Sequence, residues 1–250
     1  MGTLASVELA DPVPDETVLD QVFAWLHEVD RRFSTFKEDS EVNLLQRREL
    51  TYEQVSEDMR EVLDACARLW QATEGFFDAY AMGRLDPSGY VKGWSVQRAS
   101  QMLTLAGAVN HVVEAGGDLQ ARGRPVPDGA WQIGIRHPWE PDKVAWVLSG
   151  TDLAVATSGT YERGLHVINP RTGRPATALR SVTVVGRHLA DADAFATAAV
   201  AMGRDALTWL AGLDGYEAAV IAEEGTSYQS AGLPELRSDN GEPVDFARLA

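Results

Sequence analysis

Cysteine, long apolar runs and net positive charge are what this sequence lacks. Its only cysteine, Cys66, excludes intrachain disulfides and thiolate metal sites, and its place in a helical apolar pattern predicts a buried, inert thiol. No apolar run approaches the roughly 20 residues of a membrane helix, so we expect no membrane span. The opening segment, MGTLASVELADPVPDE, lacks the basic start and apolar middle of a signal peptide, which predicts a soluble, cytoplasmic protein.

The negative net charge limits the classes of partner that we expect this protein to bind. Acidic residues outnumber basic ones, 37 to 22, which gives a formal net charge of −15. Phosphate backbones and anionic lipid surfaces would be repelled over most of such a surface, so we expect no nucleic-acid partner and no binding to anionic membranes. An anionic ligand would need local cations or a metal ion to offset this field.

The order of helical and strand-like patterns predicts an α+β fold, with a mixed or antiparallel sheet packed with helices. At 250 residues, the chain fits one domain over 1–250, or two closely packed halves, helix-rich over about 1–107 and strand-rich over 108–250. Apolar spacing predicts helices near 18–33, 41–45, 56–73, 92–105, 190–203 and 204–212, and strands near 2–10, 109–114, 131–135, 144–148, 153–157, 166–168, 182–185, 216–222 and 226–230.

The segment LADADAFATAAVAMG, residues 189–203, carries a carboxylate at Asp193 and a hydroxyl at Thr197. Residues four apart share one face of a helix, and two hard oxygen ligands on one face suit a magnesium ion beside a phosphate. The alternative is that Asp193 interacts with the helix dipole and that Thr197 is a packed core residue.

A second candidate is the loop LDPSGYVKGW at 85–94, with Asp86, exposed backbone at 88–89, and Lys92 at the expected start of a helix. Backbone groups at a tight turn and a helix N-terminus suit a phosphate or a metal, and Lys92 would supply a cation. An ordinary type I turn followed by a surface lysine is the alternative.

Three further segments carry weaker signals. Paired glycines in EAGGDL, residues 114–119, fit close backbone approach to a ligand or a turn equally well. His166 could take a proton or polarise a phosphoryl oxygen, although a lone histidine in a strand is more often structural; Arg171 and Arg174 nearby fit solvated turn residues equally. In GFFDAY, Phe76 and Phe77 could wall a flat aromatic ligand or belong to the core. Asp78 could bind such a ligand or cap the next segment.

In this order, these segments and their neighbours resemble the FAD:protein FMN transferases of the ApbE family over nearly the whole chain. Nine matching segments in one order make chance similarity a poor explanation. They are MGT at 1–3, FSTFKEDSEVNLL at 33–45, GFFD at 75–78, LDPSGYVKGWSVQRA at 85–99, EAGGD at 114–118, WQIGIRHP at 131–138, ATSGTYER at 156–163, HVINPRTGRP at 166–175 and ADAFAT at 192–197.

The resemblance implies a layered, T-fold-like architecture and a magnesium-dependent enzyme with FAD as substrate. Such an enzyme splits FAD at its pyrophosphate, moves the FMN part onto a threonine or serine of an acceptor flavoprotein domain, and releases AMP. By position, Asp193 and Thr197 match side-chain Mg²⁺ ligands, and Gly89 matches a main-chain carbonyl ligand. His166 matches a histidine associated with activity. The positions that match flavin-nucleotide contacts are Met1, Phe36, Phe76, Phe77, Asp78, Asp86, Lys92 and Val167.

Two alternatives to transfer stay open. Water could replace the protein hydroxyl, which would make the protein an FAD pyrophosphatase that forms FMN and AMP. A noncatalytic flavin-binding or carrier protein is the other alternative. It is favoured by the short segment between Asp78 and Asp86, where many family members carry a longer insertion, and disfavoured by the Asp193–Thr197 pair.

Overall fold

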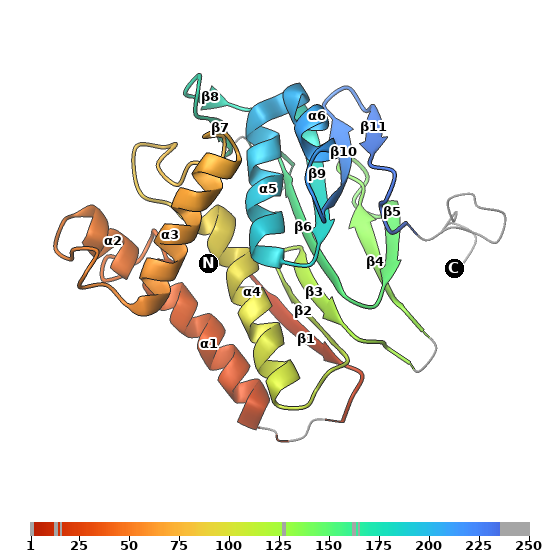
Figure 1. The fold of residues 1–250 in the computed structure, drawn as a ribbon, viewed down its shortest axis with the longest axis horizontal. Coiled ribbons are helices and arrows are strands. Elements are labelled where there is room, and N and C mark those ends of the chain that lie inside the picture. Colours follow the sequence, from red (N-terminus) through yellow and green to blue (C-terminus); the bar gives the residue numbers. More distant parts are fainter. Residues whose placement is uncertain are drawn as a thin grey trace.

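The computed structural model describes residues 3–12, 15, 17–126, 129–161, 164 and 166–235, which form an α+β fold in layers, as predicted (Figure 1). The helices are α1 (Thr17–Phe33), α2 (Glu41–Gln46), α3 (Glu57–Ala72), α4 (Ser88–Leu105), α5 (Leu189–Met202), the short 3-10 helix η1 (Gly203–Asp205) and α6 (Ala206–Ala211). The strands are β1 (Ala5–Leu9), β2 (His111–Ala115), β3 (Asp118–Arg122), β4 (Trp131–Arg136), β5 (Val144–Gly150), β6 (Leu153–Gly159), β7 (Ile168–Asn169), β8 (Arg174–Pro175), β9 (Leu179–Gly186), β10 (Glu217–Ala222) and β11 (Ser227–Gln229).

Seven strands form the main sheet, in the order β1-β2-β3-β6-β9-β10-β11. Every strand pair within the described ranges is antiparallel, which decides between the mixed and antiparallel sheets that the sequence allowed. β1 pairs with β2 from Ala5↔Ala115 to Leu9↔His111, so the helix-rich part of the chain contributes an edge strand to the sheet. The β4–β5 and β7–β8 pairs form two separate small sheets.

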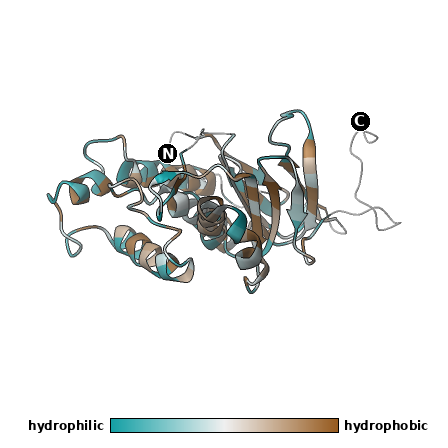
Figure 2. Cartoon of the chain, turned by 90° about the horizontal axis from the view of Figure 1, so that it is seen from above, coloured by the Kyte–Doolittle hydropathy of each residue, from teal (hydrophilic) through white to brown (hydrophobic). Residues whose placement is uncertain are grey.

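α4 and α5 cover one face of the main sheet, α4 over β2 and β3, and α5 over β6 and β9 (Figure 1). α5 is rich in alanine and buried on nearly every side, because small side chains let its backbone approach both the sheet and α4. α1 packs on α4 through an apolar stripe at helical spacing. Hydrophobic residues gather along the strands and these helices (Figure 2). No helix in the described part of the chain is long and apolar enough to cross a membrane.

The opposite face of the sheet is covered by the β4–β5 hairpin. Strand alternation divides the core in two, since Ala154 and Ala156 of β6 face the helices while Leu153 and Val155 face the hairpin. The hairpin contributes the large side chains of Trp131, Ile135, Trp146 and Leu148 to this second cluster.

Strands β3 and β7 are among the elements that differ from the sequence expectation. β3 was not predicted: Gly116 and Gly117, with φ of 57° and 88°, form a two-residue turn that pairs Ala115 with Asp118. This geometry favours glycine at both positions, so the Gly-Gly pair is the turn of a hairpin. The strand expected over 166–168 is confined to Ile168–Asn169, where it pairs with β8.

Candidate functional site

α4 and α5 come into close contact through two glycines. A Cβ at Gly93 would lie 2.5 Å from the carbonyl oxygen of Leu189 and 2.9 Å from the Cβ of Asp193. One turn earlier, a Cβ at Gly89 would lie 3.2 Å from Oγ1 of Thr197. Residues four apart share a helix face, so the two glycines of α4 face the Asp193–Thr197 pair of α5. The two strongest sequence motifs thus meet at one crossing.

Asp193 lies at this crossing with a side chain that is only 2% exposed. Its Oδ2 accepts a hydrogen bond of 2.9 Å from the main-chain N–H of Gly93. In a regular helix this N–H pairs with the carbonyl four residues earlier, which belongs to Gly89. Asp193 therefore accepts from the residue one turn after Gly89, whose carbonyl the family resemblance assigns to the metal. Asp191, not Asp193, occupies the first turn of α5, so the helix-dipole alternative does not describe Asp193.

Lys92 lies beside Asp193 with a side chain that is 15% exposed. The sequence placed Lys92 at the start of a helix, and this prediction is wrong. α4 begins at Ser88, which places Lys92 in its second turn. The Lys92 ammonium contacts Oδ2 of Asp118 and lies 3.5 Å from Oδ1 of Asp193. Asp118 is fully buried, and its Oδ1 accepts a hydrogen bond of 3.0 Å from the main-chain N–H of Thr157. Burial and then the charge of Asp118 raise the pKa of Asp193, while Lys92 opposes the rise.

The oxygen atoms at the crossing fit a hard divalent cation such as Mg²⁺. A carboxylate, a hydroxyl and a main-chain carbonyl, from Asp193, Thr197 and Gly89, are the ligand types that this ion prefers. Oγ1 of Thr197 also lies 3.2 Å from Oγ of Ser158 on β6, a contact that orients the threonine hydroxyl. Among the residues that the structure describes, no three His, Cys, Asp or Glu side chains could together hold a metal. Mg²⁺ at this crossing would need substrate phosphates or water to complete its shell.

A cavity of about 370 Å³ opens beside the crossing. It is lined by all the predicted site residues that the structure describes, and their individual roles stay predictions; Met1 lies outside the described residues. The predicted residues that line it are Phe36, Phe76, Phe77, Asp78, Asp86, Gly89, Lys92, His166, Val167, Asp193 and Thr197.

Aromatic side chains form part of the cavity wall. Phe76 and Phe77 are almost fully buried, whereas Phe36 is 91% exposed at the surface. The guanidinium carbon of Arg171, in the β7–β8 turn, lies 4.1 Å from the centroid of the Phe76 ring. Arg171 also lies 3.5 Å from a carboxylate oxygen of Glu74. Arg171 is thus no isolated turn residue, because it joins the β7–β8 turn to the aromatic wall.

The two acidic residues of the short loop shape its backbone. Oδ1 of Asp78 accepts from the N–H of Tyr80 at 2.8 Å, and Oδ1 of Asp86 accepts from the N–H of Ser88 at 3.1 Å, at the start of α4. The N–H of Asp86 donates to the carbonyl of Ala79 at 2.7 Å and closes the loop. The capping alternative therefore describes Asp78 in this structure, although both carboxylates also line the cavity.

His166 is an exposed residue of the cavity wall. Its Nδ1 lies 3.0 Å from the carbonyl oxygen of Gly164, which can only accept a hydrogen bond. The neutral ring therefore carries its proton on Nδ1, and Nε2 is the nitrogen that can accept a proton.

Asp118 and Ser158 are among the polar residues at this site that sequence reasoning missed. Asp118 directly follows the Gly-Gly turn, and reading that turn as a hairpin would have placed it at the start of a strand. The contact of Ser158 with Thr197 joins residues 39 positions apart, so no local pattern signals it.

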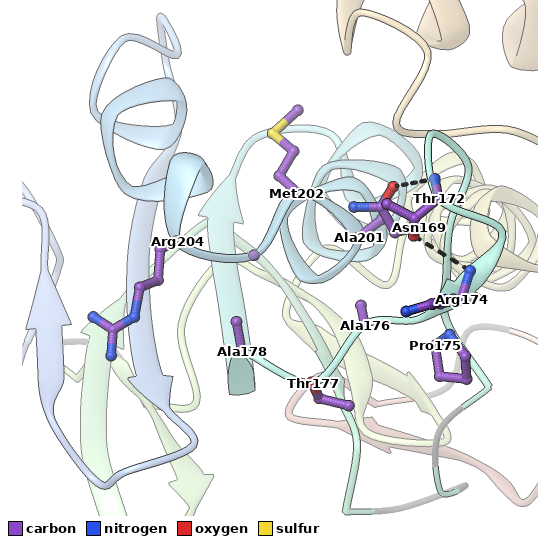
Figure 3. Close-up of a pocket in the computed structure, with 11 residues that line it drawn as sticks. Asn169, Thr172, Arg174, Pro175, Ala176, Thr177, Ala178, Ala201, Met202 and Arg204 are labelled. Atoms are coloured by element: carbon purple, nitrogen blue, oxygen red, sulfur yellow. Dashed lines mark hydrogen bonds between the residues drawn. The ribbon is translucent and has the colours of Figure 1, made fainter.

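A second, more open hollow of about 660 Å³ borders the β7–β8 turn and the end of α5 (Figure 3). Asn169, Thr172 and Arg174 line it and form hydrogen bonds along the turn. Arg204, which also lines it, pairs with Glu224. None of the predicted catalytic or metal residues lines this hollow, so its larger volume does not make it the candidate site.

Comparison with known proteins decides the family. A family model described as the ApbE family matches residues 1–82 and 80–220. The chain belongs to the ApbE family. The resemblance drawn from its sequence motifs is thereby confirmed.

Curated relatives named FAD:protein FMN transferase match parts of this ApbE chain. The protein of Rhodobacter capsulatus is 34% identical over 62% of the chain and 31% of its own length. That of Vibrio cholerae is 34% identical over 48% of the chain and 39% of its own length. The chain thus spans between three and four tenths of these two relatives. It spans 79% of the protein of Haemophilus influenzae, at 25% identity over 82% of the chain.

Solved structures of ApbE proteins share the fold. The flavin transferase ApbE from Vibrio cholerae is 25% identical, with a TM-score of 0.77 over 94% of this chain and 96% of its own. The ApbE protein of Thermotoga maritima is 22% identical, with a TM-score of 0.79 over 92% of this chain and 97% of its own. The predicted α+β, ApbE-like layered fold is therefore confirmed.

Proposed function

We propose that this protein transfers FMN from FAD to a threonine or serine hydroxyl of an acceptor flavoprotein and releases AMP, with Mg²⁺ as the required metal. The observation that carries this proposal is the meeting of the predicted flavin contacts, Lys92 and the Asp193–Thr197 pair on one cavity. The name of the curated relatives, FAD:protein FMN transferase, supports the same activity.

The charges at the site suit a pyrophosphate. Bound Mg²⁺ would stabilise the negative charge that develops on the phosphate oxygens as the bond breaks. Asp193, Thr197 and the carbonyl of Gly89 would hold the ion. Lys92 adds a second positive charge, so the site offers an anion the local potential that a chain of charge −15 otherwise lacks.

The transfer step requires one bond to form and one to break. The acceptor hydroxyl oxygen forms a bond to the phosphorus of the FMN part, and the bond from this phosphorus to the bridging oxygen breaks, so that AMP leaves with that oxygen. We assign His166 as the group that takes the hydroxyl proton through Nε2, because Nδ1 faces the Gly164 carbonyl.

Incubation of the full chain with FAD, Mg²⁺ and candidate flavoprotein domains tests the proposal, with intact-mass measurement of the acceptor and AMP quantification. We expect an acceptor to gain the mass of FMN and covalent fluorescence, with AMP formed in step with the adduct. Equal AMP release with and without acceptor would identify an FAD pyrophosphatase instead. FAD binding with neither adduct nor AMP would identify a carrier protein.

A further inference from the structure

We propose that Asp118 is a positioning residue of this site, which holds the Lys92 ammonium group beside Asp193 and so keeps the Asp193 carboxylate available to Mg²⁺. This inference rests on the proposed function, and it assigns a task to a residue that the family resemblance leaves without one.

The first support is how firmly Asp118 is fixed. It is the first residue after the Gly116–Gly117 turn, is fully buried, and faces α4 from β3. One of its oxygens accepts from the main-chain N–H of Thr157 at 3.0 Å, and the other contacts Lys92. A carboxylate held at both oxygens by a strand and a cation cannot turn away from the ammonium group, so the position of Lys92 follows from that of Asp118.

The second support is the distribution of charge. One ammonium group faces two buried carboxylates: it contacts Asp118 and stays 3.5 Å from Oδ1 of Asp193. Oδ2 of Asp193 already accepts from the N–H of Gly93, so Oδ1 is the oxygen over which Lys92 and a metal ion would compete. Without the charge of Asp118, Asp193 becomes the nearer carboxylate, and the flexible lysine stem allows the ammonium to close on it.

The third support is that Asp118 and the expected metal ligands belong to different elements. Asp118 lies on β3, whereas Gly89 is on α4 and Asp193 on α5. Its carboxylate contacts Lys92 and the main-chain N–H of Thr157 on β6 and lies close to the carboxylate of Asp193, but Asp118 does not line the cavity. Asp118 is therefore a positioning residue and not a ligand: besides the direct effect of its charge on Asp193, it acts on the metal site by holding Lys92.

Mg²⁺ binding to the full chain without FAD, measured by calorimetry, tests this directly. We expect Asp118→Asn to weaken Mg²⁺ binding about tenfold or more, and Asp118→Glu, which keeps the charge, to stay within about threefold of wild type. In a Lys92→Met background, we expect Asp118→Asn to change binding less than about threefold, because the residue that it positions is gone. Asp191→Asn removes a carboxylate from the same helix as Asp193 and serves as the charge-matched control.

The inference would be overturned if Asp118→Asn weakened Mg²⁺ binding equally in the wild-type and Lys92→Met backgrounds, or in neither. If Lys92→Met does not fold, the Mg²⁺ dependence of FMN transfer by Asp118→Asn tests the inference instead. A positioning role raises the Mg²⁺ concentration for half-maximal rate by about tenfold while kcat at saturating Mg²⁺ falls less than about threefold, since excess Mg²⁺ displaces Lys92. A fall in kcat with an unchanged Mg²⁺ requirement contradicts the inference. Wild-type protein that neither binds Mg²⁺ nor transfers FMN contradicts the proposed function itself, whatever the variant does.

Discussion

The main-chain N–H of Gly93 donates to Oδ2 of Asp193 at 2.9 Å, where α4 crosses α5. The bond needs a residue without a side chain at position 93, since a Cβ there would lie 2.5 Å from the Leu189 carbonyl oxygen. The position of Asp193 thus depends on a glycine that is separated from it by 100 residues.

Gly93→Ala is expected to push the two helices apart. Overpacking against backbone should lower the free energy of unfolding by about 2 kcal/mol, measured by urea denaturation. Gly134→Ala is the matched control, because a Cβ there meets Val144 at an ordinary 3.5 Å, and its effect should stay within about 0.5 kcal/mol. Equal stability of the two variants would show that the crossing tolerates a side chain.

Asp193→Asn should remove Mg²⁺-dependent turnover. Asparagine keeps an acceptor for the Gly93 N–H but loses the charge that binds the metal, so we expect at least about a 100-fold lower rate with little change in the melting temperature. Asp191→Asn, on the same helix but paired with Arg68 at the surface, should keep wild-type turnover. Retained turnover in Asp193→Asn would reject the metal role of Asp193.

Arg171→Ala should loosen the aromatic wall of the cavity. Loss of a cation–π contact of about 0.5–2 kcal/mol with Phe76 predicts a several-fold higher KM for FAD with a nearly unchanged kcat. Arg174→Ala, in the same turn but lining the other hollow, should leave the KM for FAD unchanged. If both variants raised the KM for FAD equally, the cause would be a change in the β7–β8 turn and not the loss of the Arg171–Phe76 contact.

His111 should make the protein less stable in mild acid. Burial lowers the pKa of His111 in the folded state, where its ring contacts Ser100 and the Ala108 carbonyl. In the unfolded chain the ring takes up a proton near its ordinary pKa of about 6.5, so below that pH the unfolded state binds more protons and is favoured. The free energy of unfolding should therefore fall as pH drops below about 6.5, by at most about 1.4 kcal/mol per pH unit from this group.

Urea unfolding of wild type and His111→Gln between pH 8 and pH 5 measures this contribution. The variant should be less stable throughout, because it loses both ring contacts, but its stability should fall less steeply below pH 6.5. Parallel pH profiles would show that His111 does not cause the loss.

Cys66 should be unreactive in the folded protein. It lies on α3, and burial raises the pKa of its thiol to about 12, so almost no thiolate is present at pH 8. We expect no reaction with a disulfide reagent such as DTNB in buffer and one thiol per chain in urea. Rapid labelling of the folded protein would show that α3 opens readily.

The sequence predicted most elements because their apolar spacing and turn residues are local. The helical spacing of α1 and α3 can be read from the local sequence alone. The same holds for the hydroxyl and the carboxylate that share one face of α5. The family resemblance added the positions that now line one cavity. The contacts of Asp118 and Ser158 could not be predicted, because they join residues on separate strands and helices. The Gly116–Gly117 pair fits a hairpin turn and a ligand-binding loop equally well, so the sequence alone did not distinguish them.

The cavity draws on both the earliest and the late parts of the chain, since Thr3, Gly116 and Thr197 all line it. β1 forms one edge of the sheet, while α5 packs on the central strands β6 and β9. Such contacts form only after large loops have closed, so binding competence should appear late in folding. Removing α5 would delete the cavity residues Asp193 and Thr197, which makes ligand binding a sensitive reporter of complete folding.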